Sequence, residues 1–206
     1  NSNLKTSIIA FLASVLLLTA ASSMSAGAPD ISELRRKAQS GDVDAQVKLA
    51  DELQSGENVT PDSKQAAKLY LSAAQKGDAT AQKRLAMAYD SGQGVVQSDA
   101  EARKWYERSA LQGDQTAQFA LALMLQLGKG GTTNAIEALK WCEVAASHGN
   151  AMSAPVVGFC STLALDMSTN EVAMAKRLAA EFIPKTERKP TPLDSTTRQM
   201  FLDDIE

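Results

Sequence analysis

Small and apolar positions return at a fixed interval of 36 residues through the middle of the chain. Glycine stands at Gly41, Gly77, Gly113 and Gly149, and other residue types keep the same spacing. The positions in register include Ala45-Gln46, Ala81-Gln82 and Ala117-Gln118; Leu49, Leu85 and Leu121; Ala66, Ala102 and Ala138; Trp105 and Trp141. Such a period is typical of helical repeat proteins, in which each unit buries its apolar face only by stacking on its neighbours.

Each unit is predicted to form two antiparallel helices, A and B, joined by short loops. Residues that accept hydrogen bonds from a first helical turn precede each helix, and glycine, which tolerates the left-handed conformation, follows helix A. A glutamine or glutamate three residues after the helix B cap predicts a capping box. The predicted caps are Asp42, Asp78, Asp114 and Asn150 for helix A, and Asp62, Ser98 and Asn134 for helix B; the closing glycines are Gly56, Gly92 and Gly128.

The period also predicts how the chain is divided. The first and last units are expected to cap the stack, and Pro155 is expected to delay the last helix A until about Ser153. Asn170 is expected to precede a final helix near 171–182. The predicted parts are a signal peptide (1–28), a capping half-repeat (29–41), repeats at 42–77, 78–113 and 114–149, a degenerate repeat (150–183) and a flexible tail (184–206).

The N-terminal segment has the pattern of a secretory signal peptide. Lys5 is the only charged residue before Asp30, and an apolar run from Ile8 to Ala21 is followed by small residues as far as Ala28. As a helix this run would extend ~21 Å, short of the ~30 Å bilayer core, so an uncleaved anchor is the lesser alternative. No cysteine for lipid attachment follows it. We therefore expect an exported protein, periplasmic or secreted, with no membrane span in the mature chain.

Charge and composition exclude several kinds of function. The chain has 21 basic and 24 acidic residues, one histidine and two cysteines, so neither nucleic-acid binding nor a Cys/His zinc site is expected. His148 precedes Gly149, where it is predicted to bond the last carbonyls of a helix B. Gly128-Lys129-Gly130-Gly131 lacks the spacing of a phosphate-binding loop. We expect no cofactor, no metal and no catalytic residues.

From Ala81 to Gly113 the chain runs A-Q-x-x-L-A-x-x-x-x-x-G-x-G-V-x-x-x-x-x-A-x-x-W-Y-x-x-x-A-x-x-G. This motif resembles the Sel1-like repeat, a branch of the tetratricopeptide-type solenoids, and the resemblance covers about residues 30–182. It implies an all-α, right-handed α/α solenoid that binds a protein or peptide. For an exported bacterial member it implies a monomeric, non-enzymatic scaffold in envelope signalling, assembly or host contact.

The alternative function is an envelope enzyme or a glycan-active protein on the same solenoid, because some relatives have been linked to β-lactam binding and hydrolysis. The expected nucleophile motif would be Ser-x-x-Lys. Its one occurrence, Ser2 to Lys5, lies inside the predicted signal peptide.

In solenoids of this kind the A helices usually line the concave surface, where a partner is expected to bind. The residues predicted to line it are Lys83, Met87, Phe119, Leu123 and Phe159. Its N-terminal end is charged and its C-terminal end is apolar. The helix over 117–127 is apolar nearly all round, which predicts an exposed apolar face unless the fourth unit covers it.

Two pairings remain open from the sequence. Cys142 and Cys160 are predicted to lie at similar heights on antiparallel neighbours, where they form either a disulfide or two buried thiols. The tail carries Met200, Phe201, Leu202 and Ile205 near its end. It either plugs the apolar end of the groove or stays solvated.

Overall fold

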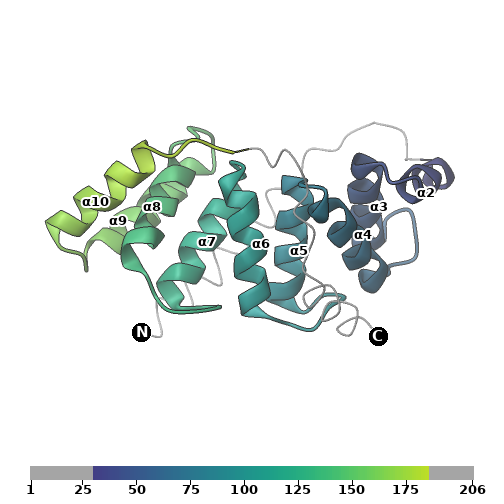
Figure 1. Cartoon of the computed structure of the whole chain (residues 1–206), viewed down its shortest axis with the longest axis horizontal. Helices are drawn as coiled ribbons and strands as arrows, with labels where there is room; N and C mark the ends of the chain where they lie inside the picture. Colours follow the sequence, from purple (N-terminus) through teal and green to yellow (C-terminus); the bar gives the residue numbers. More distant parts are fainter. Residues whose placement is uncertain (1–29, 186–206) are drawn as a thin grey trace. The chain divides into compact units, whose positions relative to one another are not determined.

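The computed structural model describes residues 30–185. The chain divides into two units, Asn1–Asp30 and Ile31–Glu206, and all the described helices belong to the second (Figure 1). The described part contains nine helices and no strand, as the all-α prediction requires. The helices are α2 (Ile31–Gln39), α3 (Val43–Ser55), α4 (Ser63–Gln75), α5 (Ala79–Ser91), α6 (Asp99–Leu111), α7 (Gln115–Leu127), α8 (Ala135–Ala146), α9 (Ser153–Ala164) and α10 (Thr169–Ala180). The tail plug and the signal peptide concern residues outside this range.

The caps of the A helices in the three repeats form as the sequence predicts. Asp42, Asp78 and Asp114 each accept a hydrogen bond from the backbone N–H three residues later, at 2.7–2.9 Å. Each of these helices then ends at a glycine in the left-handed conformation, with φ between 68° and 73°. Both ends of each A helix are therefore specified locally by the sequence.

Helix B is capped as predicted, but only half of the expected capping box forms. Asp62, Ser98 and Asn134 accept from the N–H of the third helical residue. Glu101 and Glu137 do not complete a box and instead form ion pairs with the lysines three residues further along, Lys104 and Lys140. Among α3 to α10, only α10 has the reciprocal box.

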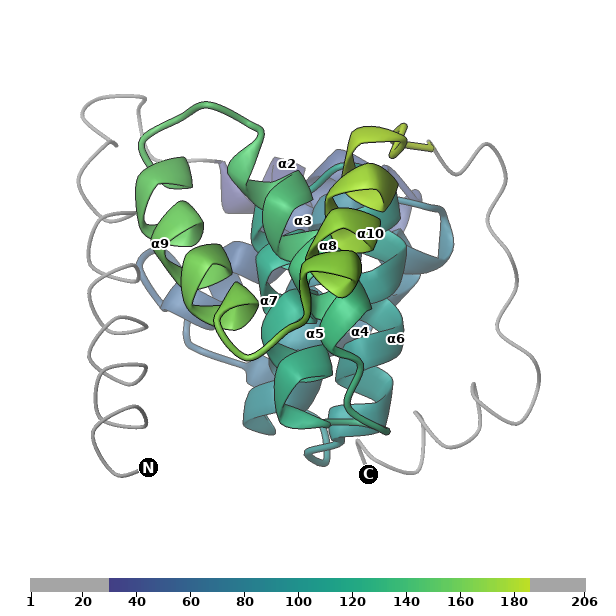
Figure 2. The same ribbon diagram turned by 90° about the vertical axis from the view of Figure 1, so that its left-hand side faces the viewer.

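Consecutive helices from α2 to α9 pack against one another in chain order. Figure 2 shows α7 and α9 on one side and α6, α8 and α10 on the other, so the A and B helices form two layers. Alanines that are completely buried fill the contacts between the layers, and they allow the helices to approach closely. These alanines include Ala66, Ala74, Ala86, Ala102, Ala110, Ala122 and Ala138.

The glutamine of each Ala-Gln pair ties a repeat to the end of the preceding helix B. Gln46, Gln82 and Gln118 are buried, and their Nε2 atoms donate to carbonyls eight residues earlier, each at 3.2 Å. Those carbonyls belong to Ala38, Ala74 and Ala110, in the last turns of α2, α4 and α6. Each carbonyl also accepts from the N–H of the glycine three residues later, so the glutamine adds a second hydrogen bond at the helix end.

The amide oxygen of each glutamine accepts a second bond from the end of the next helix B. Lys76, Gln112 and His148 stand 36 residues apart, and each reaches the glutamine of its own repeat, at 3.4, 2.8 and 2.9 Å. The prediction that His148 bonds last-turn carbonyls is therefore wrong. The Gln118 amide nitrogen already donates to Ala110, so its oxygen is the acceptor and His148 Nε2 is the donor.

Two loop glycines allow one repeat to lie close to the next. A side chain at Gly94 would place its Cβ 2.0 Å from the Ser63 carbonyl oxygen, and one at Gly130 would be 2.4 Å from that of Asp99. The same position in the first repeat holds Asn58. Asn58 borders an open hollow of about 910 Å³ beside α2, which explains why a side chain fits there.

The fourth unit departs from the predicted repeat. Helix α9 begins at Ser153 as expected, but its N-cap is Met152, and Asn150 instead makes a turn that accepts from the Met152 N–H. Helix α10 begins two residues earlier than predicted because Ser168, rather than Asn170, caps it. The two helices do not pack as a hairpin: each packs separately against α8 (Figure 2).

The chain after α10 turns back across the ends of the B helices. The ring of Phe182 meets Trp141 edge to face at 5.2 Å, and the Lys185 N–H donates to the Leu111 carbonyl at 2.8 Å. Pro184 lies beside Gly113. The sequence predicts a flexible tail from residue 184, but the first two residues of that tail contact α6 and the turn after it. The rest of the tail lies outside the described residues.

Candidate functional site

Between Asp30 and Lys185 no group of three His, Cys, Asp or Glu side chains could hold a metal ion. Over the same residues no helix is both long and apolar enough to cross a membrane. The candidate functional site is instead a surface that the A helices form.

The five residues predicted to line that surface lie on α5, α7 and α9, and all five are half-buried. They belong to two registers, each of which repeats every 36 residues: one runs through Asp51, Met87, Leu123 and Phe159, and the other through Val47, Lys83 and Phe119. All seven are half-buried. We call these seven residues the A-helix face.

The C-terminal half of the A-helix face is aromatic and uncharged. Phe119 on α7 and Phe159 on α9 meet edge to face, with ring centroids 5.4 Å apart, and Leu123 is half-buried on α7. Neither α7 nor α9 contains a charged residue. Apolar side chains held partly open in this way can receive an apolar side chain of a partner.

The prediction that α7 exposes a broad apolar face is only partly correct. Leu121, Ala122, Met124 and Leu125 are buried in the stack. Leu127, at the C-terminal end of the helix, is 56% exposed. The helix is apolar nearly all round because it packs between α6 and α8.

The N-terminal half of the A-helix face carries charges that are paired. Lys83 Nζ lies 2.7 Å from Asp114 Oδ2, while the other carboxylate oxygen of Asp114 caps α7. Asp51 accepts a hydrogen bond from the Tyr70 hydroxyl at 2.6 Å and lies 3.0 Å from Arg84 Nε. The ion pair of Lys83 with Asp114 therefore links α5 to the start of α7, and Lys83 also lines the A-helix face.

Burial and acidic neighbours keep two tyrosines of this region protonated. Burial raises the pKa of Tyr70 far above its usual value, and the hydrogen bond to Asp51 raises it further. Burial also raises the pKa of Tyr106, with a smaller contribution from the negative charges of Asp90 and Asp114. Both phenols therefore act as neutral groups, and neither is suited to proton transfer near neutral pH.

Lys129, from the glycine loop after α7, completes the charged region. Its Nζ lies 3.1 Å from Asp90 and 3.8 Å from Asp99. Partial burial alone would lower the pKa of this lysine, but the two carboxylates outweigh burial and raise it. The loop thus fastens the third repeat to α5 and α6, a structural role that agrees with its lack of phosphate-loop spacing.

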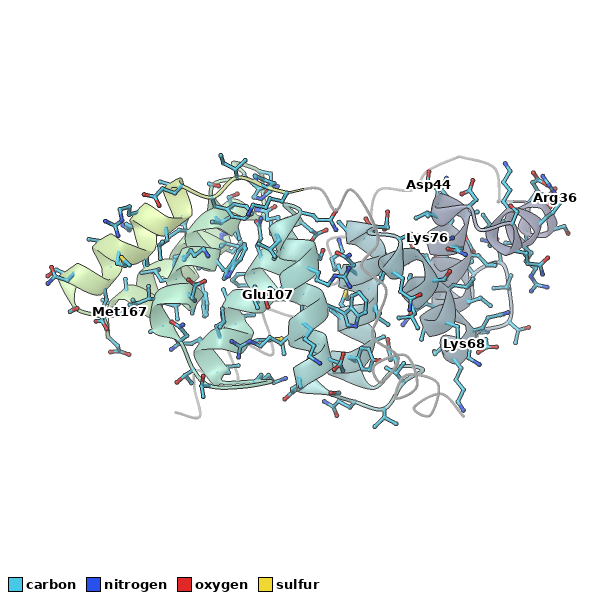
Figure 3. The ribbon with its side chains drawn as sticks, viewed as in Figure 1. Arg36, Asp44, Lys68, Lys76, Glu107 and Met167 are labelled. Atoms are coloured by element: carbon cyan, nitrogen blue, oxygen red, sulfur yellow. A yellow bond between two sulfur atoms is a disulfide. The ribbon has the colours of Figure 1, made fainter. Side chains whose placement is uncertain are left out.

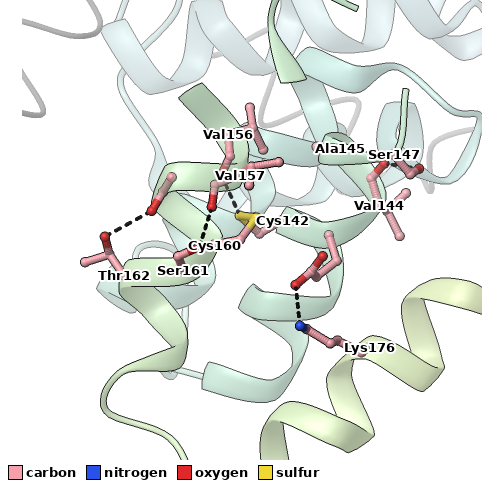
Figure 4. The surroundings of a disulfide bond; sticks show 12 residues. Cys142, Val144, Ala145, Ser147, Val156, Val157, Cys160, Ser161, Thr162 and Lys176 are labelled. Atoms are coloured by element: carbon pink, nitrogen blue, oxygen red, sulfur yellow. Dashed lines mark hydrogen bonds and ion pairs between the residues drawn. A yellow bond between two sulfur atoms is a disulfide. The ribbon is translucent and has the colours of Figure 1, made fainter. Parts of the chain in front are cut away.

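A disulfide joins Cys142 of α8 to Cys160 of α9, with Cα atoms 5.6 Å apart (Figure 4). Both cysteines are buried. The sequence left open whether the two thiols are bridged. Because α9 has no hairpin partner in α10, the disulfide and the Phe119–Phe159 contact hold the last A helix against the stack. They thereby position Phe159 on the A-helix face.

Two kinds of contact at this surface were not predicted from the sequence. One is the set of buried glutamine bonds, for which the repeated Ala-Gln pair was an available signal. The other is the set of ion pairs, such as Lys83 with Asp114, whose members lie 31 residues apart. A pairing over that distance follows from the stacking of particular helices, and it leaves no local pattern.

Stacked helical pairs with a continuous, partly open face on one layer define a helical-repeat scaffold. The family model of the Sel1 repeat matches residues 43–78, 79–114 and 115–150, which together make up just over half of the chain. The chain therefore belongs to the Sel1 repeat family. Repeats of this family generally act as protein-interaction scaffolds.

Solved structures agree with this assignment. A Sel1 repeat protein from Oxalobacter formigenes is 32% identical, with a TM-score of 0.55, and the match covers 61% of this chain and 95% of that one. The protein c5321, described as a protective antigen of uropathogenic Escherichia coli strains with an SLR fold, is 21% identical with a TM-score of 0.56. That match covers 82% of this chain and 43% of c5321, and it supports the fold. No curated protein matches the chain.

Proposed function

We propose that this chain is a non-enzymatic scaffold that binds a segment of a partner protein along its A-helix face. The observation that carries the proposal is the continuity of that face. One register stays half-buried from α3 to α9 and the other from α3 to α7, and the lining changes from paired charges at Asp51 and Lys83 to aromatic groups at Phe119 and Phe159.

This gradient favours a partner segment with two unlike ends. An apolar side chain of the partner would lie between Leu123 and the two phenylalanines, where contact removes apolar surface from water. Polar groups would meet the charged half, where paired charges favour orientation more than affinity. An extended peptide or a short helix satisfies this description.

The proposal includes export, because the pattern from Lys5 to Ala28 is that of a signal peptide. The c5321 relative is described as a protective antigen, which is compatible with a role at the cell envelope. The N-terminus of the protein purified from its own host is expected between about Ser22 and Pro29, and mass spectrometry measures it directly. A full-length soluble species in the cytosol would contradict export.

Substitution on the A-helix face tests the binding proposal. The purified chain and its Leu123→Asp variant are immobilised and incubated with envelope extract from the same host. Leu123→Asp should reduce retention of the partner by roughly tenfold or more, because a carboxylate would have to be desolvated in an apolar contact. Lys68→Ala is the matched control, since Lys68 points away from the stack on α4 (Figure 3).

Both variants should keep the circular dichroism spectrum of the unchanged chain. Equal retention by the unchanged chain and by Leu123→Asp would overturn the proposed surface. The alternative of a β-lactam-active enzyme remains a prediction, because its Ser2–Lys5 pair lies outside the described residues.

A further inference from the structure

Helix α9 exposes the face that the other A helices bury. In α3, α5 and α7 three registers of this face are buried, and their residues are Leu49, Ala50 and Leu53; Leu85, Ala86 and Tyr89; Leu121, Ala122 and Leu125. The same registers in α9 hold Val157, Gly158 and Ser161, and all three are exposed, Val157 by 50%. Leu165, just past the end of the helix, is 81% exposed.

The position of α10 accounts for this exposure. In each of the three repeats the A helix packs against its own helix B as well as the preceding one. Helix α10 instead packs on α8, where Lys176 faces Glu143 at 3.8 Å (Figure 4). Helix α9 is therefore held on one side, and the side that corresponds to a repeat-stacking contact has no partner within the described chain.

The exposed side of α9 is almost purely apolar. The hydroxyl of Ser161 donates to the Val157 carbonyl, and that of Thr162 donates to the Gly158 carbonyl, so both polar groups are satisfied within the helix (Figure 4). No residue of α9 is charged. An added Cβ at Gly158 would meet nothing within 4 Å, so the middle of this side is open.

We propose that the exposed side of α9 is a contact between two copies of this chain. A two-fold contact brings each helix against its own copy, so any charge on it would face a like charge. Helix α9 meets this condition because it has none, whereas the outer positions of α2 and α10 carry several. Each copy would supply the helix that the other lacks.

The size of this contact sets the strength that we expect. One helix face buries less than the roughly 800 Å² per partner of a standard stable interface, so the dimer should dissociate in the micromolar range. This differs from the monomer that the sequence favours. The proposal is independent of the A-helix face, which can be open or occupied in either state.

Sedimentation equilibrium of the purified chain over about 1 to 100 μM tests the proposal. The average mass should rise with concentration toward that of a dimer. Gly158→Lys should weaken association roughly tenfold or more, since it places two like charges in the contact, and the open space allows the side chain to fit without unfolding the helix. Ala173→Lys, on an exposed position of α10, is the matched control and should associate as the unchanged chain does.

Cross-linking adds a second readout that does not depend on stability. A thiol-specific cross-linker should convert the Ser161→Cys variant to a covalent dimer much faster than the Ala173→Cys variant. A monomer at every concentration, an undiminished association of Gly158→Lys, or equal cross-linking of the two cysteine variants would each overturn the proposal. The first of these results would favour a helix of a different protein as the occupant.

Discussion

Single buried side chains couple each repeat to the next. The glutamine that follows alanine bonds the end of the preceding helix B through its nitrogen, and the end of its own helix B through its oxygen. Because these bonds lie in the apolar core, a residue that cannot make them removes buried hydrogen bonds between neighbouring repeats. The glutamine of the Ala-Gln pair therefore helps to determine how neighbouring repeats pack against each other.

Replacing Gln82 by alanine should lower stability by about 1–3 kcal/mol, because its hydrogen bonds with the Ala74 carbonyl and the Gln112 amide are both lost, while each of these groups keeps its bond to Gly77. The midpoint of urea unfolding measures the loss. Gln93→Ala is the matched control, since Gln93 is exposed and its side chain bonds only the half-buried Gln54 in the described contacts. A loss of stability for Gln82→Ala no larger than that of the control would contradict this role.

Stability should also fall at high pH through the two buried tyrosines. Their pKa values are raised on folding, so the folded state favours the protonated phenol. The stabilisation is fully present below the ordinary tyrosine pKa of about 10 and is lost as the pH rises above it. Tyr106→Phe should therefore lose less stability than the unchanged chain between pH 9 and pH 11, as followed by thermal unfolding at each pH. An identical decline in both would contradict the prediction.

The helices differ in how far the sequence predicts them. The A helices of the repeats have aspartate caps and closing glycines in register, and their bounds follow directly from these residues. The position of α10 could not be predicted, because α10 is a short amphipathic helix that could pack on either α8 or α9. Its position depends on which of the two packs against it more favourably. In α9 the register that should receive it has Gly158 and Ser161 in place of the alanine and larger apolar residues of the repeats, which weakens the hairpin contact.

Two glycines test the difference between a repeat junction and the open end of the stack. Gly94→Ala should be strongly destabilising, because its Cβ would overlap the Ser63 carbonyl and its φ of 76° is unfavourable for alanine. Gly158→Ala should stabilise the chain by about 1 kcal/mol, because it lies inside α9 with nothing near its Cβ. Thermal unfolding of both variants measures the two effects, and equal shifts would contradict the assignment.

The disulfide is expected to matter most to α9. Replacing both cysteines by alanine should cost about 2–4 kcal/mol, since the bridge closes a loop between residues 18 apart in sequence. Amide hydrogen exchange should accelerate in α9 more than in α5 or α7, because α9 does not pack between two B helices as they do. Uniform acceleration across the helices would show that the bridge stabilises the whole stack instead.

At the scale of the whole molecule the chain is a Sel1 repeat scaffold whose A-helix face is open along the repeats. The fold and the registers of that face could be predicted, because a 36-residue period determines which residues recur on the same side. What the face contacts could not be predicted in detail. The pairing of Lys83 with Asp114, and the meeting of Phe119 with Phe159, arise from helices that are adjacent only after stacking.

Site-specific photo-cross-linking in the native host tests the A-helix face most directly. A photoreactive phenylalanine derivative at position 123 should give a discrete adduct with one partner protein, and an excess of unlabelled chain, but not of Leu123→Asp, should suppress it. The same group at position 68, on the exposed side of α4, should give no such adduct. Two results would contradict binding at this face. One is an equal yield of adduct at positions 123 and 68, and the other is suppression of the adduct at 123 by Leu123→Asp as strongly as by the unchanged chain.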